Sequence, residues 1–230
     1  MPSAVVLLSG GIDSMVTGAI ARERGFEVSA LSIAYGQRHG VELDAAERVG
    51  RALGISRHVF QTVDLRVFGR SALTDAIAVP LDRPVSDMAA DIPITYVPAR
   101  NTIFLSLALA LAESIGAFDL FIGANAIDYS GYPDCRPAFI AKFEELANVA
   151  TAAAVDGRGR FAAHAPLIQM TKARIIREGV RLCLDFSLTH SCYAPDERGR
   201  ACGRCDSCRL RARGFAEAGV ADPTLYVRSF

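Results

Sequence analysis

The chain has 230 residues, enough for a domain with a substantial hydrophobic core, and its 25 basic residues are balanced by 25 acidic ones. A net charge of zero argues against a general electrostatic attraction to nucleic acid. Residues 103–112 are the most lipid-like segment but are about half as long as a membrane span, and no basic leader with a cleavage site opens the chain. We therefore expect a cytoplasmic protein, in which six cysteines favour metal binding or reduced thiols over disulfides.

The first distinctive stretch is the turn Ser9-Gly10-Gly11-Ile12-Asp13-Ser14. The apolar run 4–8 before it predicts a strand buried on both faces, and apolar residues at helical spacing after it predict a helix that stops at Gly25. Adjacent glycines allow backbone N–H groups to converge at a helix N-terminus, which makes a site for phosphate. The spacing matches neither a Walker A loop nor a dinucleotide-binding motif. The alternative is an ordinary strand-to-helix turn capped by serine or aspartate.

The rest of the chain alternates between strand and helix patterns. Strands are predicted at 27–34, 58–63, 118–123 and 161–165, and helices at 41–53, 103–115, 138–155 and 172–184. Prolines interrupt residues 64–100, which are predicted to form a lid or an extended loop, and residues 103–115 are apolar almost all round, which predicts a buried helix. This alternation predicts an α/β fold with a doubly wound parallel sheet. Ligands then bind beyond the carboxyl ends of the strands, where Ser9 and Tyr35 both lie.

Four cysteines, in the pattern Cys192-x9-Cys202-x2-Cys205-x2-Cys208, follow the predicted main domain at residues 1–184. They mark residues 185–230 as a small zinc-binding helical appendage. Four thiolates complete the tetrahedral coordination of zinc, so we expect one structural Zn²⁺ with no open position. The alternatives are an iron–sulfur cluster, although the Cys-Pro continuation common in ferredoxins is absent, and disulfides. A helix is predicted at 209–217, and the arginines near the cluster either bind nucleic acid or form a solvated face: Arg204, Arg209, Arg211 and Arg213.

A polar segment, residues 123–136, follows the predicted strand 118–123. Its tyrosines, carboxylates and amide suit a purine-like ring, because they can stack on the ring face and pair with its N–H edge, while an arginine can bind a carboxylate. The residues concerned are Asn125, Asp128, Tyr129, Tyr132, Asp134 and Arg136. A polar loop fixed by Pro133 is the alternative. Cys135 has no histidine near it in sequence, so we expect an inert thiol, and Cys183 is expected in the core.

Two basic residues open predicted helices at the same end of the sheet. Arg100 is followed by Asn101, which either points towards the ligand or only caps the helix. Lys172 either neutralises phosphate charge in a transition state or is an exposed lysine of the first helical turn. The four histidines do not fall at spacings typical of a metal or catalytic site.

The turn at 9–14 resembles the PP-loop of the ATP pyrophosphatase superfamily, and further motifs occur in the order found in one family of that superfamily. These motifs are Tyr35-Gly36-Gln37-Arg38-His39, Pro98-Ala99-Arg100-Asn101, residues 128–136, and Ser191-Cys192-Tyr193 with the three later cysteines. In these motifs the chain resembles the 7-cyano-7-deazaguanine synthases over nearly its whole length. Residues 66–92 match poorly, and Met15-Val16 depart from the small or hydroxyl residues common after the loop.

The resemblance implies an adenine nucleotide α-hydrolase-like fold and an ATP-dependent carbon–nitrogen ligase of queuosine biosynthesis. Such a ligase converts 7-carboxy-7-deazaguanine and ammonia into 7-cyano-7-deazaguanine through an adenylated carboxylate and an adenylated amide. It implies catalytic roles for Asp13, Arg100 and Lys172, with Mg²⁺ positioned by Asp13 unless that residue only caps its helix. Binding of ATP and substrate is expected from Leu8, Ser9, Gly10, Gly11, Ile12, Asp13, Ser14, Gln37, Arg38, Asn125, Asp128, Tyr129, Tyr132, Asp134 and Arg136. The expected partners are the small-molecule substrate and ammonia, which enters either free or from a partner protein. Members of the family are often dimers, and neither nucleic acid nor a membrane is an expected partner.

Two other functions remain open from the sequence. A related PP-loop enzyme would adenylate tRNA or a protein terminus and would be active only with that macromolecule. A zinc-containing nucleotide-binding scaffold would bind ATP without turnover.

Overall fold

The computed structural model describes residues 1–37, 39–84, 92–127 and 131–227. Within them the chain forms a five-stranded sheet in the order β3-β2-β1-β4-β5, with every neighbouring pair parallel. The strands are β1 (Ser3–Leu7), β2 (Glu27–Ala34), β3 (Arg57–Thr62), β4 (Asp119–Phe121) and β5 (Ala162–His164). The predicted doubly wound parallel sheet is confirmed. The strand order reverses between β1 and β4, and such switch points open a crevice at the carboxyl ends of the strands.

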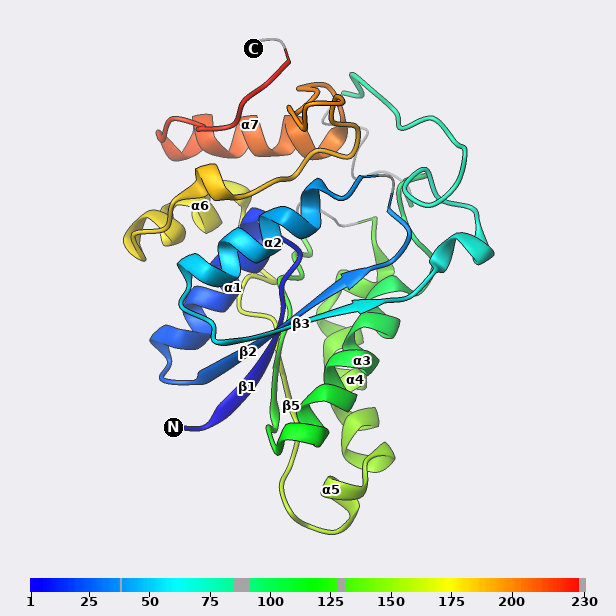
Figure 1. The fold of residues 1–230 in the computed structure, drawn as a ribbon, viewed down its shortest axis with the longest axis vertical. Coiled ribbons are helices and arrows are strands. Elements are labelled where there is room, and N and C mark those ends of the chain that lie inside the picture. Colours follow the sequence, from blue (N-terminus) through cyan, green and yellow to red (C-terminus); the bar gives the residue numbers. More distant parts are fainter. Residues whose placement is uncertain (38, 85–91, 128–130, 228–230) are drawn as a thin grey trace.

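Helices cover both faces of this sheet. Figure 1 shows α1 (Ile12–Glu23) and α2 (Val41–Ala52) on one side and α3 (Arg100–Ile115) with α4 (Pro137–Ala150) on the other. The remaining helices are α5 (Ala152–Val155), α6 (Lys172–Arg181) and α7 (Asp206–Ala218). The last two pack against each other beyond the carboxyl ends of the strands, above helix α1 in Figure 1. None of these described helices combines the length and apolar character needed to cross a bilayer.

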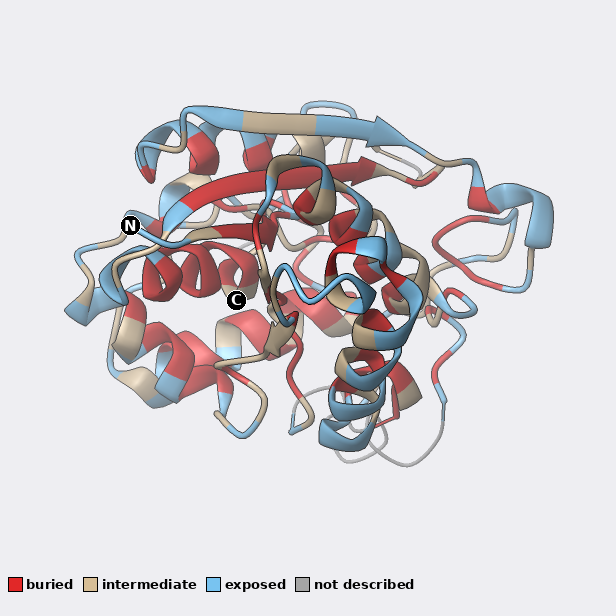
Figure 2. Ribbon diagram, turned by 90° about the horizontal axis from the view of Figure 1, so that it is seen from below, coloured by how far each residue is buried: buried red, intermediate tan, exposed pale blue. Residues whose placement is uncertain are grey.

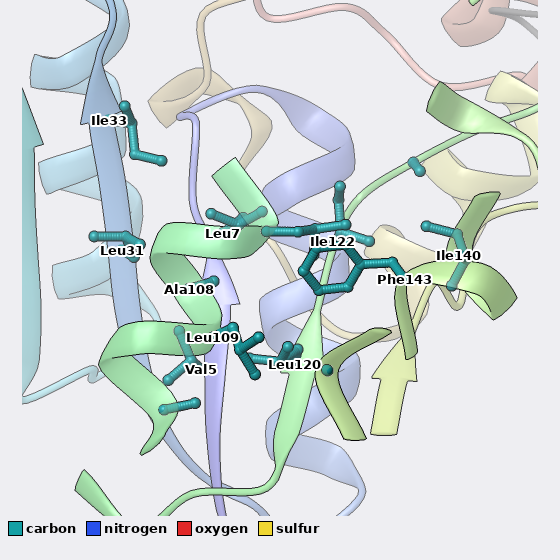
Figure 3. Packing of buried hydrophobic residues seen from close by; sticks show 14 of the residues in the cluster. Val5, Leu7, Leu31, Ile33, Ala108, Leu109, Leu120, Ile122, Ile140 and Phe143 are labelled. Carbon is teal, nitrogen blue, oxygen red and sulfur yellow. The ribbon is translucent and has the colours of Figure 1, made fainter. Parts of the chain in front are cut away.

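The main core lies between the sheet and the α3–α4 layer. Side chains from β1 and β2, such as Val5 and Leu31, meet Ala108 and Leu109 of α3 and Phe143 of α4 (Figure 3). Burial follows the position of each strand. Figure 2 shows β2 buried along most of its length, whereas β3 at the edge of the sheet is largely exposed. Buried central strands of this kind explain the continuous apolar runs in the sequence.

Three sequence predictions for the helices need correction. The helix predicted at 138–155 is two helices, because Thr151 has an extended backbone (φ −113°, ψ 142°) that separates α4 from α5. The helix predicted at 172–184 ends at Arg181, and Cys183 follows in the left-handed region (φ 56°). Cys183 is exposed, so its expected place in the core is wrong. Helix α3 is buried on one face only, since its Ser106 is exposed.

The segment predicted as a lid or extended loop is irregular where the structure describes it. It starts with a single 3-10 turn, Leu65–Phe68, and residues 71–74 then enter the interior. Further along, Leu81 pairs with Cys205 in an isolated antiparallel bridge. This segment therefore connects the edge of the sheet to the cysteine-rich region rather than projecting freely.

Candidate functional site

The turn after β1 brings backbone and hydroxyl groups together at the switch point of the sheet. Ser9 donates from Oγ to Ser14 Oγ at 3.2 Å, and Ser14 Oγ donates to the Gly11 carbonyl at 3.0 Å. Gly11 is the N-cap residue of α1, and it has no side chain that could accept hydrogen bonds from the first N–H groups of the helix. The first N–H groups of α1 are therefore available to an anion, as expected from the sequence for a phosphate site.

Two glycines allow this turn to sit tightly between neighbouring segments. Gly10 has φ +82°, and a Cβ there would lie 2.5 Å from the Glu42 carbonyl and 2.6 Å from the Ala46 nitrogen in α2. Gly123, directly after β4, would place a Cβ 2.9 Å from the Asp13 carbonyl carbon. Because these neighbours are backbone atoms, they cannot rotate away. The turn is thus fixed by α2 on one side and by the end of β4 on the other.

Asp13 and Lys172 form an ion pair beside the turn, although 159 residues separate them in sequence. Lys172 Nζ donates to both carboxylate oxygens of Asp13 at 2.7 and 2.8 Å, and the two side chains are only 9% and 17% exposed. Lys172 is therefore not an exposed first-turn lysine. Asp13 does not cap α1, since it lies inside the first turn and its oxygens accept from Lys172. Its proposed role towards Mg²⁺ stays a prediction.

A cavity of about 220 Å³ opens beside this ion pair. One part of its wall is polar and consists of turn residues and a lysine: Ser9, Gly11, Asp13, Ser14 and Lys172. The rest of the wall is mainly apolar and aromatic. A volume of this size suits a small-molecule ligand or part of a nucleotide. Of the residues predicted to bind ATP or substrate, the lining contains Leu8, Ser9, Gly11, Ile12, Asp13, Ser14, Gln37, Asn125 and Tyr132.

Arg100 lies in the same cavity among aromatic rings. Its guanidinium carbon is 5.6 Å from the centre of the Tyr35 ring and 6.0 Å from that of Phe104, both within cation–π range. No carboxylate of the described residues lies within ion-pair distance of it. An arginine in this setting can bind an anionic group of a ligand in a bidentate manner.

Glu42, on the first turn of α2, also lines the cavity. Burial raises the pKa of Glu42 to about 7, against the opposing effect of the positive charge of Arg100. The cavity therefore contains a carboxyl group and a guanidinium group that do not form an ion pair with each other. Glu42 was not among the residues predicted from the sequence, although it lies three residues after the Tyr-Gly-Gln-Arg-His motif.

The polar segment 123–136 contributes in part to the cavity. Asn125 donates from Nδ2 to the carbonyls of Leu167 at 3.3 Å and Met170 at 2.5 Å, so it fixes the chain that leads to α6. Tyr132 lines the cavity and its hydroxyl is 2.8 Å from Thr95 Oγ1. Asn125 therefore holds the backbone before α6 in place, whereas Tyr132 lines the cavity, where it can contact a ligand.

Other residues of this prediction lie elsewhere or outside the described residues. Asp134 is buried and accepts from the Asn101 backbone N–H at 3.1 Å, and it does not line the cavity. Arg136 is exposed at the start of α4 and also lies outside the cavity lining, so its binding role stays a prediction without geometric support. Arg38, Asp128 and Tyr129 are outside the described residues.

Asn101 and Cys135 meet at the wall of the cavity. Asn101 is inside α3 rather than at its N-cap, which is Ala99, and its Nδ2 donates to the Asp134 carbonyl at 3.0 Å and to Cys135 Sγ at 3.4 Å. Burial raises the pKa of the Cys135 thiol to about 11. A thiol with this pKa is a poor nucleophile at neutral pH, which agrees with the inert role expected for it.

The four C-terminal cysteines come together as predicted. The sulfurs of Cys192, Cys202, Cys205 and Cys208 all lie within 4.8 Å of one another. Ligands at about 2.3 Å from a tetrahedral zinc ion would be about 3.8 Å apart, and the Cys202 and Cys208 sulfurs are 4.0 Å apart. A disulfide would need about 2.05 Å. The arrangement therefore fits a metal bound by four thiolates.

Backbone N–H groups surround these sulfurs. Cys192 Sγ accepts from Ala194 at 3.3 Å and from Cys202 at 3.2 Å, and Cys202 Sγ accepts from Arg204 and Cys205 at 3.4 and 3.3 Å. Such donors stabilise negative charge on thiolates. The loop that carries Cys192 also covers the turn at residues 9–14, here named the phosphate-type turn, because the His190 N–H donates to the Gly10 carbonyl at 3.0 Å.

Three of the four arginines near the cysteine cluster pair with carboxylates. Arg211 is only 2% exposed and pairs with Asp222 at 3.0 Å, so it belongs neither to a solvated face nor to a nucleic-acid contact. It also donates to Thr189 Oγ1 at 2.7 Å and lines the cavity. Arg204 pairs with Asp82, and Arg213 pairs with Glu217.

Sequence reasoning missed several residues that line the cavity. Phe104, His190, Ser207 and Arg211 join Glu42 there. Phe104 belongs to an apolar helix pattern and carries no sequence signal of its own, and Arg211 was considered only as a nucleic-acid contact or as part of a solvated face. Tyr35, Ser191 and Tyr193 also line the cavity and lie in motifs named above, but they were not among the residues predicted to bind ATP or substrate.

These features define the class of protein. A doubly wound parallel sheet, a Ser-Gly-Gly turn at its switch point and a C-terminal four-thiol site identify an α/β protein of the PP-loop type. A solved structure with a similar fold is the NMN synthetase of Francisella tularensis. It has a TM-score of 0.50 and 14% identity, covers 96% of this chain and 78% of its own, and at that identity shows the fold alone.

Residues 3–219 match the family model described as "Queuosine biosynthesis protein QueC", and the chain belongs to this family. Curated relatives agree over almost the full length. The 7-cyano-7-deazaguanine synthase of Myxococcus xanthus is 60% identical, with 98% of each chain covered. The protein of the same name from Kineococcus radiotolerans is 61% identical, with 97% of each chain covered.

Proposed function

We propose that this protein is an ATP-dependent ligase that converts 7-carboxy-7-deazaguanine and ammonia into 7-cyano-7-deazaguanine. Membership of the QueC family and the names of relatives about 60% identical support the product, 7-cyano-7-deazaguanine. The observation that carries the proposal is one cavity in which an anion-binding turn with Lys172 adjoins Arg100 among aromatic rings. The first part suits a nucleotide triphosphate, and the second suits a flat heterocycle that bears a carboxylate.

The chemistry explains why adenylation is needed. A carboxylate reacts poorly with ammonia because oxide is a very poor leaving group. Attack of the carboxylate on the α-phosphate of ATP gives an acyl adenylate and pyrophosphate. Ammonia then forms the C–N bond, and AMP and one proton leave. The amide oxygen takes a second AMP group from ATP with release of pyrophosphate, and loss of that AMP with the two protons on nitrogen leaves the nitrile.

This chain supplies positioning and charge for these steps. The N–H groups at the start of α1 and Lys172 are oriented to stabilise the departing pyrophosphate. Asp13 holds the Lys172 ammonium group through both carboxylate oxygens, which fixes its position. Arg100 would orient the carboxylate of the substrate towards the α-phosphate. Preorganised charges of this kind lower a barrier without reorganisation during the reaction.

Two metal ions are part of the proposal. Zn²⁺ would be held by the four cysteines and would keep the 190–193 loop against the turn, with no part in the chemistry. Mg²⁺, carried by ATP, would neutralise charge on the phosphates. Free ammonia is the proposed nitrogen source, and the working location is the cytoplasm.

The test is pyrophosphate release by the purified protein with ATP, Mg²⁺, ammonium chloride and 7-carboxy-7-deazaguanine. We expect release that depends on the acid, together with a product whose mass is that of the nitrile. Omitting ammonium should leave acid-dependent exchange of pyrophosphate into ATP. Absence of any acid-dependent release or exchange would refute the proposal.

A further inference from the structure

Glu42 is an acidic side chain for which the steps above provide no role. It lies on the first turn of α2, with its backbone against the phosphate-type turn at Gly10. Among the described residues, its carboxylate accepts no hydrogen bond and forms no ion pair. A carboxylate that lines a cavity without such a partner is costly to bury, so a ligand that carries N–H groups or positive charge would relieve that cost.

A second, much smaller cavity lies beside Glu42. Its volume is about 10 Å³, close to the room needed by one water molecule. It shares Tyr35, Gln37, Glu42 and Tyr193 with the walls of the large cavity, so the two spaces adjoin at these residues. Its other walls are His39, Leu73 and Cys192.

The walls of the small cavity suit a compact cation. Glu42 supplies a negative charge, and Tyr35 and Tyr193 supply phenol rings that attract cations. The Gln37 side-chain oxygen is fixed there because it accepts from the Tyr35 N–H at 2.7 Å. Leu73 is only 6% exposed, so an apolar side chain limits the size of any occupant. Ammonium is about as large as water, has one positive charge and has four N–H donors.

We propose that Glu42, with Tyr35 and Tyr193, forms an ammonium-binding subsite that supplies the nitrogen donor to the large cavity. The inference rests on the proposed function, since it assigns a place to the nitrogen that this reaction consumes. Ammonium loses one proton to solvent before it reacts. The resulting ammonia forms the C–N bond with the acyl adenylate as AMP and a second proton leave.

The first test replaces Glu42 with glutamine, which keeps the shape and removes the charge. We expect Glu42→Gln to raise KM for ammonium about tenfold or more, because a charge-assisted hydrogen bond is lost. KM for ATP and for the acid, and acid-dependent exchange of pyrophosphate without ammonium, should be unchanged. Glu47→Gln is the matched control, since Glu47 is on the same helix but pairs with Arg51 at the surface.

Three results of this test would overturn the inference. A raised KM for the acid would show that Glu42 pairs with the heterocycle, and a raised requirement for Mg²⁺ would show a metal ligand. An unchanged KM for ammonium would exclude a role in binding it. These failures differ from failure of the proposed function, in which the wild-type protein itself would show no acid-dependent exchange.

The second test enlarges the small cavity at Leu73. We expect the wild-type protein to reject methylammonium and Leu73→Ala to use it, so that the N-methyl amide appears by mass spectrometry with release of AMP. Leu73→Val is a milder variant in case alanine destabilises the fold. If a folded variant uses ammonium normally and neither variant accepts methylammonium, the assignment of the subsite to this cavity is wrong.

Discussion

The close fit of the glycine turn against α2 can be tested at Gly10. A methyl group there would lie 2.5 Å from the Glu42 carbonyl oxygen, 2.6 Å from the Ala46 nitrogen and 2.9 Å from the Ala45 Cβ. A left-handed φ of +82° costs a non-glycine residue about 1–2 kcal/mol, and overpacking against fixed backbone costs about 1–3 kcal/mol more. We therefore expect Gly10→Ala to lower the free energy of unfolding by about 2–5 kcal/mol. The folded fraction should also lose acid-dependent pyrophosphate release, because α2 or the turn must move.

Gly25→Ala is a control that separates the two costs. Gly25 has nearly the same backbone angle, φ +85°, but a methyl group added there would meet no atom within 4 Å. Its substitution should therefore cost only about 1–2 kcal/mol and leave activity intact. Urea unfolding at equilibrium measures both variants. Equal destabilisation by the two substitutions would refute the reasoning, because it would show that contact with α2 adds nothing at Gly10.

Four further predictions concern charge, metal and thiols. Lys172→Met should lower kcat by about a hundredfold or more, because positive charge at the phosphates is lost and Asp13 is left unpaired; a normal kcat would exclude its catalytic role. Metal analysis should find one zinc per chain, and its removal by a chelator should reduce thermal stability, whereas iron with visible absorbance would contradict the zinc assignment. In the metal-loaded protein at pH 8, a maleimide should modify exposed Cys183 quickly and buried Cys135 slowly, and peptide mapping would detect the reverse order. The folded-state pKa of Glu42, about 7, is above its ordinary value of 4.5, so the folded state binds the proton more tightly and Glu42 lowers stability as pH rises between these values. The stability of Glu42→Gln should therefore increase relative to that of the wild type from pH 4.5 to pH 7.5. If the free energies of unfolding of the two proteins change in parallel with pH, this prediction is wrong.

Local patterns predicted much of the fold. The strand predicted at 27–34 is β2 with the same bounds, and the predicted turn after β1 leads into α1, although the helix already begins at Ile12. These predictions succeed because buried parallel strands have continuous apolar runs and helices end at glycines such as Gly25. The four-cysteine pattern was equally informative, since two-residue gaps can bring sulfurs to one ion without help from distant segments.

Predictions failed where packing overrides local preference. Cys183 lies in an apolar pattern, but the helix ends two residues before it and the side chain is exposed. Thr151 interrupts a helical pattern that continues on both sides of it. Arg211 has the sequence context of a surface arginine, yet it is buried by its contacts with Asp222 and Thr189.

The sequence alone therefore determined the alternation of elements, the Ser-Gly-Gly turn and the cluster of four cysteines, because each depends on residues close together in the chain. Only the tertiary structure decided how distant segments share one cavity. It paired Lys172 with Asp13, surrounded Arg100 with aromatic rings, and placed Glu42 beside a space for one small molecule. Such contacts depend on the order of strands and the packing of helices, which no local pattern specifies.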